Sequence, residues 1–347
     1  MPHPVLSQRL AWWRGLLALP ALFGAVTVAS AAYWPNLPFI GTIARMIESA
    51  APHIAVPTLA LSLAIALLGG RRFGFAVAFL AVAGLAGVAL RHVQRSDPLH
   101  PEAQPVLRVL WYNMLNTNPV PPADLVAALE ASPADVILLT ESFPLRSARD
   151  LLAETFPVIE GCAGRRCDIM VLARDPAIRA RLVKMPNTGN ERIGVVQLDL
   201  ADGRQLRLVA AHLLKPWFDG LSASDEWMVA HQASTAPGPV VIVGDFNAAP
   251  WSKRLSELTA HCGLRTQRWP IPTWPAAAGR FGIPIDLILT RGGAVLREAQ
   301  PWGGADLGSN HRGLLFEIGT LPGSSIGAPS ACAVPHDAKD QMDLTAE

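Results

Sequence analysis

Three long apolar runs within the first 91 residues limit most strongly what this chain can fold into. Residues 15–44 and 73–90 carry no charged side chain, and residues 49–70 carry only His53. A helix that spans a membrane needs about 20 mostly apolar residues. The sequence therefore predicts a membrane region over residues 1–91. Its three transmembrane helices are expected at about 12–33, 52–70 and 73–91.

A cleaved signal peptide and a buried helical core are the two alternatives to an anchor. Arg9 and Arg14 precede the first run, and residues 29–31 (Ala-Ser-Ala) resemble a cleavage site. However, two further apolar runs follow, which a signal peptide alone would not need, and the runs lack a polar stripe that could face water. We therefore expect a multi-pass membrane protein, and cleavage of the first helix stays open.

The positive charges around these runs predict which side of the membrane each segment faces. Arg9 and Arg14 precede the first run, and Arg71 and Arg72 lie between the second and the third. By the positive-inside rule, the N-terminus and this turn lie in the cytoplasm. Three crossings then place the rest of the chain outside the cytoplasmic membrane, although the basic residues at 91–95 count against this orientation.

The most informative stretch after the membrane region is VVIVGDFNAAP, at residues 240–250. Four consecutive β-branched apolar residues predict a strand that is buried on both faces, and Gly244 lets the backbone turn where the strand ends. Asp245 and Asn247 follow two positions apart, so on extended chain their side chains point to the same side. A simple turn is the alternative, since Asp and Asn are common in turns.

Two rounds of strand, helix and strand surround this stretch and predict the fold class. The expected elements are a strand over 106–112, a helix over 123–131 and a strand over 135–140, then a strand over 205–211, a helix over 222–235 and a strand over 240–244. We predict an α/β fold, a four-layer α/β sandwich of two packed, mainly antiparallel sheets flanked by helices, preceded by the transmembrane helical region. The remaining boundaries are a linker over 92–106, a catalytic domain over 107–318 and a disordered tail over 319–347.

Polar side chains stand at the ends of the apolar runs of this domain, where a sheet presents them without burying an unpaired charge. They are Asn113, Glu141, His212, Asp245, Asn247, Asp286, Asn310 and His311. A carboxylate directly after a buried strand needs a partner, because an isolated buried charge is costly. A bound cation would be such a partner.

The motifs that contain these residues resemble, in content and order, the endonuclease/exonuclease/phosphatase superfamily. They are YNM, LLTES, a strand ending in histidine, GDFNAAP, IDLIL and SNH, and they extend over about 107–318. With three helices in front, the chain looks most like the membrane-anchored branch that includes the vancomycin/teicoplanin-resistance (VanJ-type) proteins.

The resemblance implies a metal site. Glu141 would be the principal ligand of Mg²⁺ or Mn²⁺, with Asn113 beside it, and both offer the hard oxygen donors that these ions prefer. Asn310 would be a further metal contact. Many family members have Ser-Asp-His where this chain has Ser309-Asn310-His311, and an amide brings no charge, which puts a second or weaker metal contact in doubt.

The resemblance also implies roles in catalysis and substrate binding. Asp245 would take the proton from an attacking water, and Asn247 would hold a phosphate oxygen or that water in line. His311 would donate to a phosphate oxygen, with Asp286 holding its ring in place and keeping it charged. His212 would be a second phosphate contact. Taken alone, His212 is more often a hydrogen-bonded residue at a strand end.

The four cysteines allow one short disulfide. Cys162 and Cys167 bracket an Ala-Gly-Arg-Arg loop and can pair in an oxidising compartment, although the sequence leaves this open. No further Cys or His lies at the close spacing of a zinc site. Cys262 and Cys332 are expected to be unpaired.

These observations predict a metal-dependent phosphoesterase that is anchored in the cytoplasmic membrane with its catalytic domain outside. Residues 101–320 hold 21 Lys and Arg against 22 Asp and Glu, so the domain lacks the basic excess of a nucleic-acid binder. We therefore favour a phosphorylated lipid or a lipid-linked phosphate as the substrate. The alternatives are a nuclease acting on extracytoplasmic nucleic acid and an inactive binding or sensing module. The lipid bilayer is the expected partner, and no protein partner can be inferred.

Overall fold

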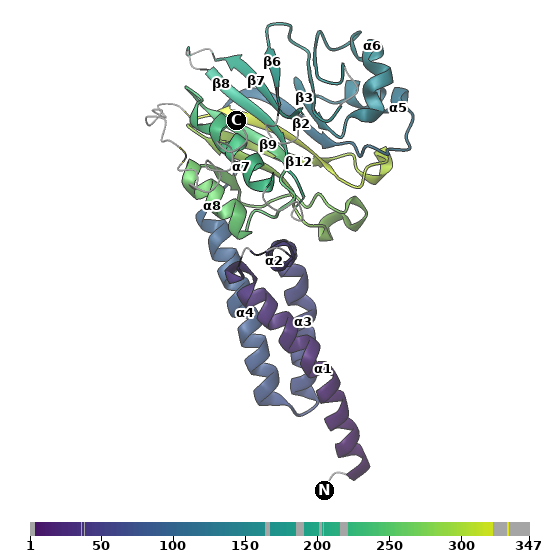
Figure 1. The fold of residues 1–347 in the computed structure, drawn as a ribbon, viewed down its shortest axis with the longest axis vertical. Helices are drawn as coiled ribbons and strands as arrows, with labels where there is room; N and C mark the ends of the chain where they lie inside the picture. The colour runs from purple at the N-terminus through teal and green to yellow at the C-terminus, as the bar shows by residue number, and fades with distance from the viewer. Residues whose placement is uncertain are drawn as a thin grey trace. The chain divides into compact units, whose positions relative to one another are not determined.

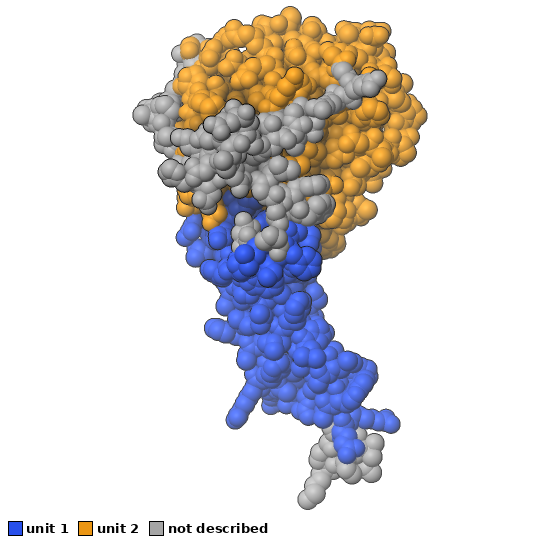
Figure 2. Space-filling view, viewed as in Figure 1, with its two compact units in different colours: residues 1–94, 251–256 blue, residues 95–250, 257–347 orange. Residues whose placement is uncertain are grey.

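The structure is a computed structural model of the chain, and it describes residues 4–35, 37, 39–163, 167–184, 191–200, 203, 205–215, 221–321 and 332. The chain divides into two compact units. Unit 1 comprises residues 1–94 and 251–256, and unit 2 comprises residues 95–250 and 257–347 (Figure 2).

Unit 1 is helical. Its main elements are α1 (Pro4–Ser30), α2 (Ile40–Ser49), α3 (Ala51–Leu67) and α4 (Arg71–Gln94), with a 3₁₀ turn, η1, at Ala31–Tyr33 (Figure 1). Residues 8–33 and α4 are long and apolar enough to cross a membrane, and α2 with α3, bent by 76°, could form a third span. The helix α2 lies between the first two expected transmembrane helices, where the sequence analysis predicted no element. Its apolar residues at 40, 43 and 47 share one face, a short helical pattern outside the long uncharged runs.

Small residues line the helix contacts of unit 1, while large apolar side chains face outward. A Cβ at Gly84 of α4 would lie 2.8 Å from the Cα of Ala29 in α1, and one at Gly74 would lie 2.6 Å from the carbonyl oxygen of Ser62 in α3. By contrast, Leu19, Phe75, Phe79 and many other large apolar side chains are exposed. Close contact through small residues with an apolar exterior is typical of helices that pack in lipid.

Unit 2 contains two mixed sheets that pack face to face. The larger sheet has the strand order β1-β10-β11-β9-β8-β7-β6, and the smaller has the order β12-β13-β2-β3-β5-β4. The strands of the larger sheet are β1 (Ser96–Asp97), β6 (Arg179–Lys184), β7 (Glu191–Asp199), β8 (Gln205–His212), β9 (Val240–Asp245), β10 (Arg265–Gln267) and β11 (Asp286–Arg291). Those of the smaller sheet are β2 (Gln104–Asn113), β3 (Val136–Thr140), β4 (Val158–Glu160), β5 (Met170–Ala173), β12 (Ala294–Trp302) and β13 (Gly313–Thr320).

Alternating side chains of the strands build two separate cores. Val109 and Trp111 of β2 join residues of both sheets, such as Val243 of β9, in the core between the sheets. Leu110 and Tyr112 point the other way, into a core beneath helices. The period of two along a strand produces this division.

Helices cover the outer faces of both sheets. The smaller sheet carries α5 (Pro122–Glu130), the 3₁₀ turn η2 (Phe143–Ala148) and α6 (Arg149–Leu152), and α7 (Leu221–Ser234) contacts β8 and β9 of the larger sheet (Figure 1). The remaining helical elements are α8 (Lys253–Cys262), η3 (Ala276–Phe281) and η4 (Ala305–Leu307). The predicted four-layer α/β sandwich, with mainly antiparallel pairing, is confirmed.

The structure differs from the sequence expectations at both ends of the domain. Within residues 92–106, expected as a linker, α4 runs on to Gln94, β1 pairs with β10, and β2 begins at Gln104. Of the tail expected over 319–347, only residues 319–321 and 332 lie within the described residues, and β13 continues to Thr320.

The expectation that Cys262 and Cys332 are unpaired was wrong, because the two form a disulfide. They are 70 residues apart in sequence, yet their Cα atoms lie 4.4 Å apart, so only the folded chain shows the pairing. Cys162 and Cys167, whose pairing the sequence left open, form a second disulfide.

Candidate functional site

Three neighbouring strands of the larger sheet, β11, β9 and β8, carry polar side chains where they end or begin, on the same side of the sheet. Asp245 at the end of β9 stands opposite Asp286 at the start of the antiparallel β11. On its other side it stands opposite His212 at the end of the parallel β8. Strand register therefore brings together three predicted site residues that are 33 to 74 positions apart in sequence.

The smaller sheet adds an amide and a second carboxylate to these side chains. Asn113 ends β2 beside Thr140 of β3, and Glu141 follows directly. The Asn113 side-chain amide donates to Asp245 Oδ2 at 3.2 Å and approaches Glu141 Oε1 at 3.5 Å. This amide thus links the polar ends of the two sheets.

His311 forms a buried pair with Asp286. Its Nδ1 lies 2.8 Å from Asp286 Oδ2, and its Nε2 lies 3.8 Å from Asp245 Oδ2. Burial by itself disfavours the charged imidazole, but the carboxylates of Asp286 and Asp245 outweigh burial and raise the pKa of His311 to about 9. At neutral pH this ring is a charged donor that faces Asp245.

His212 forms a second pair with a residue that the sequence analysis missed, Asp168. The Nδ1 of His212 lies 2.8 Å from Asp168 Oδ1, and its Nε2 lies 3.9 Å from Asp245 Oδ2. Burial works against the charge on both partners. The charge of Asp168 nevertheless raises the pKa of His212, while the charges of His212 and Arg192 hold the pKa of Asp168 well below its usual range.

Asp245 lies between the two histidine Nε2 atoms and is 2% exposed. Burial, and then the nearby carboxylate of Asp286, raise its pKa, although both histidines act in the opposite direction. Its Oδ1 accepts the backbone N–H of Asn247 at 2.9 Å. A carboxylate with a raised pKa is a stronger proton acceptor than an ordinary one, which suits a general base.

Two residues of the site hold left-handed backbone conformations that are uncommon outside glycine. Glu141 has φ +51° and Asn247 has φ +49°. Hydrogen bonds maintain both conformations: Asn116 N–H donates to Glu141 Oε2 at 2.9 Å, and the Asn247 side-chain amide donates to the carbonyl of Leu213 at 2.9 Å. Backbone strain of this kind is often concentrated at functional sites.

Asn310 is the one predicted site residue that the structure does not bring into the cluster. Its side chain is exposed, and among the described residues it makes no hydrogen bond to the other site residues. Its backbone carbonyl accepts the N–H of Ala276 at 2.8 Å. The neighbouring residue Ser309 is the structural member of the motif, because its hydroxyl donates to the carbonyl of Asn113 at 2.6 Å and accepts the N–H of His311.

The donor set of this site fits a divalent cation. One ligand atom each from Asp245, Asp286 and His311 lies within 4.8 Å of the others, but the charged ring of His311 has no lone pair to offer a cation. Both oxygens of Asp286 already have donors, namely Trp111 Nε1 and His311 Nδ1, each at 2.8 Å. Among the described residues, Glu141 Oε1 has one hydrogen-bond contact, the 3.5 Å approach of Asn113 Nδ2. Glu141 is therefore the carboxylate best placed to hold an ion. Its hard oxygen donors suit Mg²⁺ and Mn²⁺.

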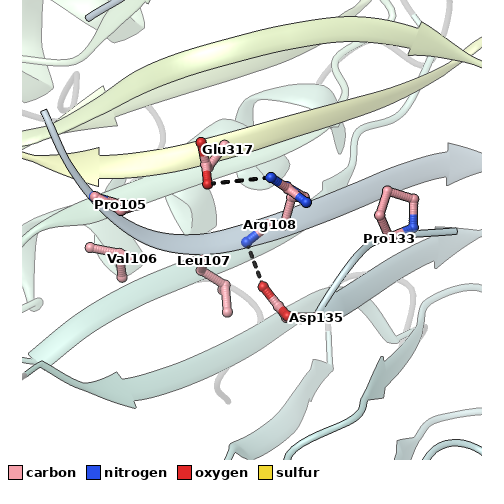
Figure 3. Close-up of a pocket in the computed structure, with 7 residues that line it drawn as sticks. All are labelled: Pro105, Val106, Leu107, Arg108, Pro133, Asp135 and Glu317. Atoms are coloured by element: carbon pink, nitrogen blue, oxygen red, sulfur yellow. Dashed lines mark hydrogen bonds and ion pairs between the residues drawn. The ribbon is translucent and has the colours of Figure 1, made fainter. Parts of the chain in front are cut away.

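A pocket of about 150 Å³ lies elsewhere on unit 2, lined in part by Arg108, Asp135 and Glu317 (Figure 3). Arg108 and Asn113 are five residues apart on β2, which corresponds to roughly 16 Å along a strand. In Figure 3 the polar groups of this pocket are joined to one another: Arg108 lies 3.8 Å from Glu317, and its backbone N–H donates to Asp135. The pocket is therefore distinct from the cluster around Asp245.

Similar solved structures share this fold. A crystal structure of D. rerio TDP2 complexed with single strand DNA product aligns with 62% of this chain and 99% of its own, at a TM-score of 0.52 and 18% identity. An endonuclease/exonuclease/phosphatase from Bacteroides vulgatus aligns with 62% of this chain and 99% of its own, at a TM-score of 0.50 and 13% identity. At such identities the similarity shows the fold alone. No curated protein matches this chain in sequence.

The sequence itself identifies the family. Residues 110–311 match the endonuclease/exonuclease/phosphatase family, and the match extends from β2 to the Ser-Asn-His motif. It includes each of the carboxylates, amides and histidines in the cluster around Asp245. Because this match covers more than half of the chain, the protein belongs to the endonuclease/exonuclease/phosphatase family.

Proposed function

We propose that this protein is a membrane-anchored phosphoesterase that depends on Mg²⁺ or Mn²⁺. The observation that carries the proposal is the position of Asp245. Its Oδ2 lies 3.9 Å and 3.8 Å from the Nε2 atoms of His212 and His311, and each of these histidines is paired through Nδ1 with a carboxylate. A buried base between two cationic donors suits the attack of water on a phosphate ester.

The residues of the chain divide the chemistry between them. Asp245 takes a proton from the attacking water, and the side-chain oxygen of Asn247 accepts a hydrogen bond from that water and holds it in line. His311 and His212 donate through Nε2 to phosphate oxygens, where negative charge builds up. A divalent cation held by Glu141 would neutralise charge on the phosphate and on the leaving oxygen. Asn113 directs its Nδ2 at Glu141 and Asp245, and its oxygen accepts the N–H of Leu115, so in this structure it acts as a donor.

The two disulfides and the apolar helices support a location for the catalytic unit outside the cytoplasm. Both described cysteine pairs of unit 2 are oxidised, which suits an oxidising compartment. Unit 1 supplies two or three helices that are apolar enough to span a membrane. This arrangement also agrees with a place in the VanJ-type, membrane-anchored branch. Reporter fusions after residues 72 and 100 test the orientation, and activity of the second fusion only in the cytoplasm would contradict it.

The favoured substrate is a phosphorylated lipid or lipid-linked phosphate. Anchoring keeps the site near lipid head groups, and the near-neutral domain offers no general excess of positive charge to a polyanion. A nuclease is the second candidate, because the family includes nucleases by its description. Hydrolysis of a polyprenyl phosphate and of plasmid DNA by the full chain, measured side by side, separates the two, and salt-sensitive cleavage of DNA would favour the nuclease.

Hydrolysis of bis(4-nitrophenyl) phosphate by the full chain in detergent tests whether the protein is an enzyme at all. We expect turnover that requires Mg²⁺, stops with EDTA and is lost in Asp245→Ala. Equal rates in the wild type and in Asp245→Ala would exclude this mechanism. A correctly folded wild type that shows no turnover on either lipid phosphate or DNA would favour the remaining alternative, an inactive binding or sensing module.

A further inference from the structure

The side chain of Asp168 contacts four other residues, which come from both sheets. Its Oδ1 accepts the hydroxyl of Thr140 at 2.7 Å, lies 2.8 Å from His212 Nδ1, and receives the backbone N–H of Glu141 at 3.3 Å. Its Oδ2 lies 3.5 Å from Arg192. One carboxylate therefore sets the position of a histidine and of the backbone at Glu141, on opposite sheets of the sandwich.

The backbone of Asp168 is restrained on both sides. Its own carbonyl accepts the N–H of Ser142 at 3.1 Å, and the next residue, Ile169, donates its N–H to Glu191 at 3.4 Å. On the preceding side the neighbour is Cys167, which is bonded to Cys162. The disulfide therefore restrains the backbone directly before Asp168 by a covalent bond.

The other end of this disulfide is firmly anchored. Cys162 is buried in the core beneath α5 and α6, the same core that contains Phe156 and Leu152. Arg149 donates to the carbonyls of Gly161 and Ile159 on the same segment. Gly161 has φ +95°, and a Cβ there would collide with the carbonyl oxygen of Ile169, so the two segments lie in close contact.

We propose that the Cys162–Cys167 disulfide is a positioning element for the active site. It ties the residue before Asp168 to this anchored segment, so that Asp168 holds the His212 ring with Nε2 directed at Asp245. The proposal rests on the proposed function, because it assigns the disulfide a part in that reaction. Mutation of groups that orient metal ligands typically lowers metal affinity or activity by about 10- to 100-fold, and we expect a change in kcat of this order for the group that orients His212.

A double-mutant cycle on the full chain in detergent separates positioning from a general effect on the fold. Cys162→Ala with Cys167→Ala should lower the kcat of Mg²⁺-dependent hydrolysis of bis(4-nitrophenyl) phosphate by about tenfold or more, while KM changes little. Asp168→Ala should lower kcat at least as much. In the Asp168→Ala background, removing the disulfide should change kcat by no more than about twofold, because both changes then act through the same group.

The second disulfide supplies the matched control. Cys262→Ala with Cys332→Ala also removes one disulfide of unit 2, and we expect a lower melting temperature with unchanged kcat. In this variant the Cys162–Cys167 bond is the remaining disulfide among the four cysteines. Dithiothreitol reduces it to two thiols and is itself oxidised to a cyclic disulfide. The rate should fall on reduction and recover on reoxidation with oxidised glutathione, which tests the proposal even if the double alanine variant does not fold.

Two results would separate this proposal from the function on which it rests. Full kcat in the folded chain without the Cys162–Cys167 bond, together with loss of kcat in Asp168→Ala, would overturn the positioning role and leave the phosphoesterase intact. Additive losses of kcat in the cycle would also overturn it. Equal rates in the wild type and Asp245→Ala would instead reject the proposed function itself.

Discussion

Trp111 donates its indole N–H to Asp286 Oδ1 at 2.8 Å, and this hydrogen bond joins the two sheets of the sandwich. Trp111 belongs to β2 of the smaller sheet and is completely buried, and Asp286 begins β11 of the larger sheet. The other oxygen of Asp286 faces His311. The core between the sheets therefore fixes the carboxylate that orients His311.

Replacing Trp111 by Phe should weaken both the fold and catalysis. The change leaves Asp286 Oδ1 buried without its donor, and an unsatisfied buried acceptor costs about 1–3 kcal/mol. We expect a lower free energy of unfolding by this amount and a reduced kcat, measured by denaturant titration and by phosphodiester hydrolysis. Trp302→Phe is the matched control, since Trp302 packs against Tyr112 on the opposite side of β2. An equal loss of kcat in both variants would contradict the role of the N–H.

The alkaline limb of the pH–rate profile should report His311. The carboxylates of Asp286 and Asp245 stabilise the imidazolium against the effect of burial and raise the pKa of His311 to about 9. His311 therefore keeps its proton at neutral pH. The rate should therefore fall as the pH rises through about 9. Asp286→Asn removes a negative charge that favours the imidazolium, which lowers the pKa of His311 and should move the limb to lower pH. His100→Gln, outside the site, should leave the limb in place, and an unchanged limb in Asp286→Asn would refute the assignment.

Asp245→Asn should abolish turnover without lowering stability. Burial and the charge of Asp286 raise the pKa of Asp245. The folded state therefore binds the proton of Asp245 more tightly than the unfolded state does, and ionisation at neutral pH destabilises the fold. An uncharged amide of similar shape avoids this cost, so we expect the melting temperature without Mg²⁺ to stay equal or rise. A clear fall in melting temperature would show that the carboxylate is structural.

The active-site residues that the sequence predicted share one property, namely that each ends or begins an apolar run. Asp245 and Asn247 follow a buried strand directly, and Glu141 follows another. The ends of such continuous apolar runs can be read from the sequence alone, so these positions were visible. Which of them meet depends on strand register across two sheets, and for that the sequence offered only the family resemblance.

Asp168 is a site residue that the positions of the strand ends do not reveal. A lone Asp before the apolar run of β5 is typical of a strand start, and its part in the site follows from its approach to His212 of β8 in the other sheet.

The strand β12 was missed for a related reason. Its burial alternates only weakly, because it lies at the edge of its sheet and carries Pro301. Both features depend on long-range pairing, as does the Cys262–Cys332 bond.

Two glycines of α4 offer a test of the packing in unit 1. A Cβ at Gly84 would lie 2.8 Å from the Cα of Ala29, whereas at Gly87 the nearest atom is the end of the flexible Arg91 side chain at 3.9 Å. Because β-branched residues need space on both sides of the Cβ, Gly84→Val should force α1 and α4 apart, while Gly87→Val should be tolerated. We expect a lower melting temperature of the full chain in detergent for Gly84→Val alone. Equal melting temperatures for the two variants would mean that α1 and α4 do not pack through their small residues.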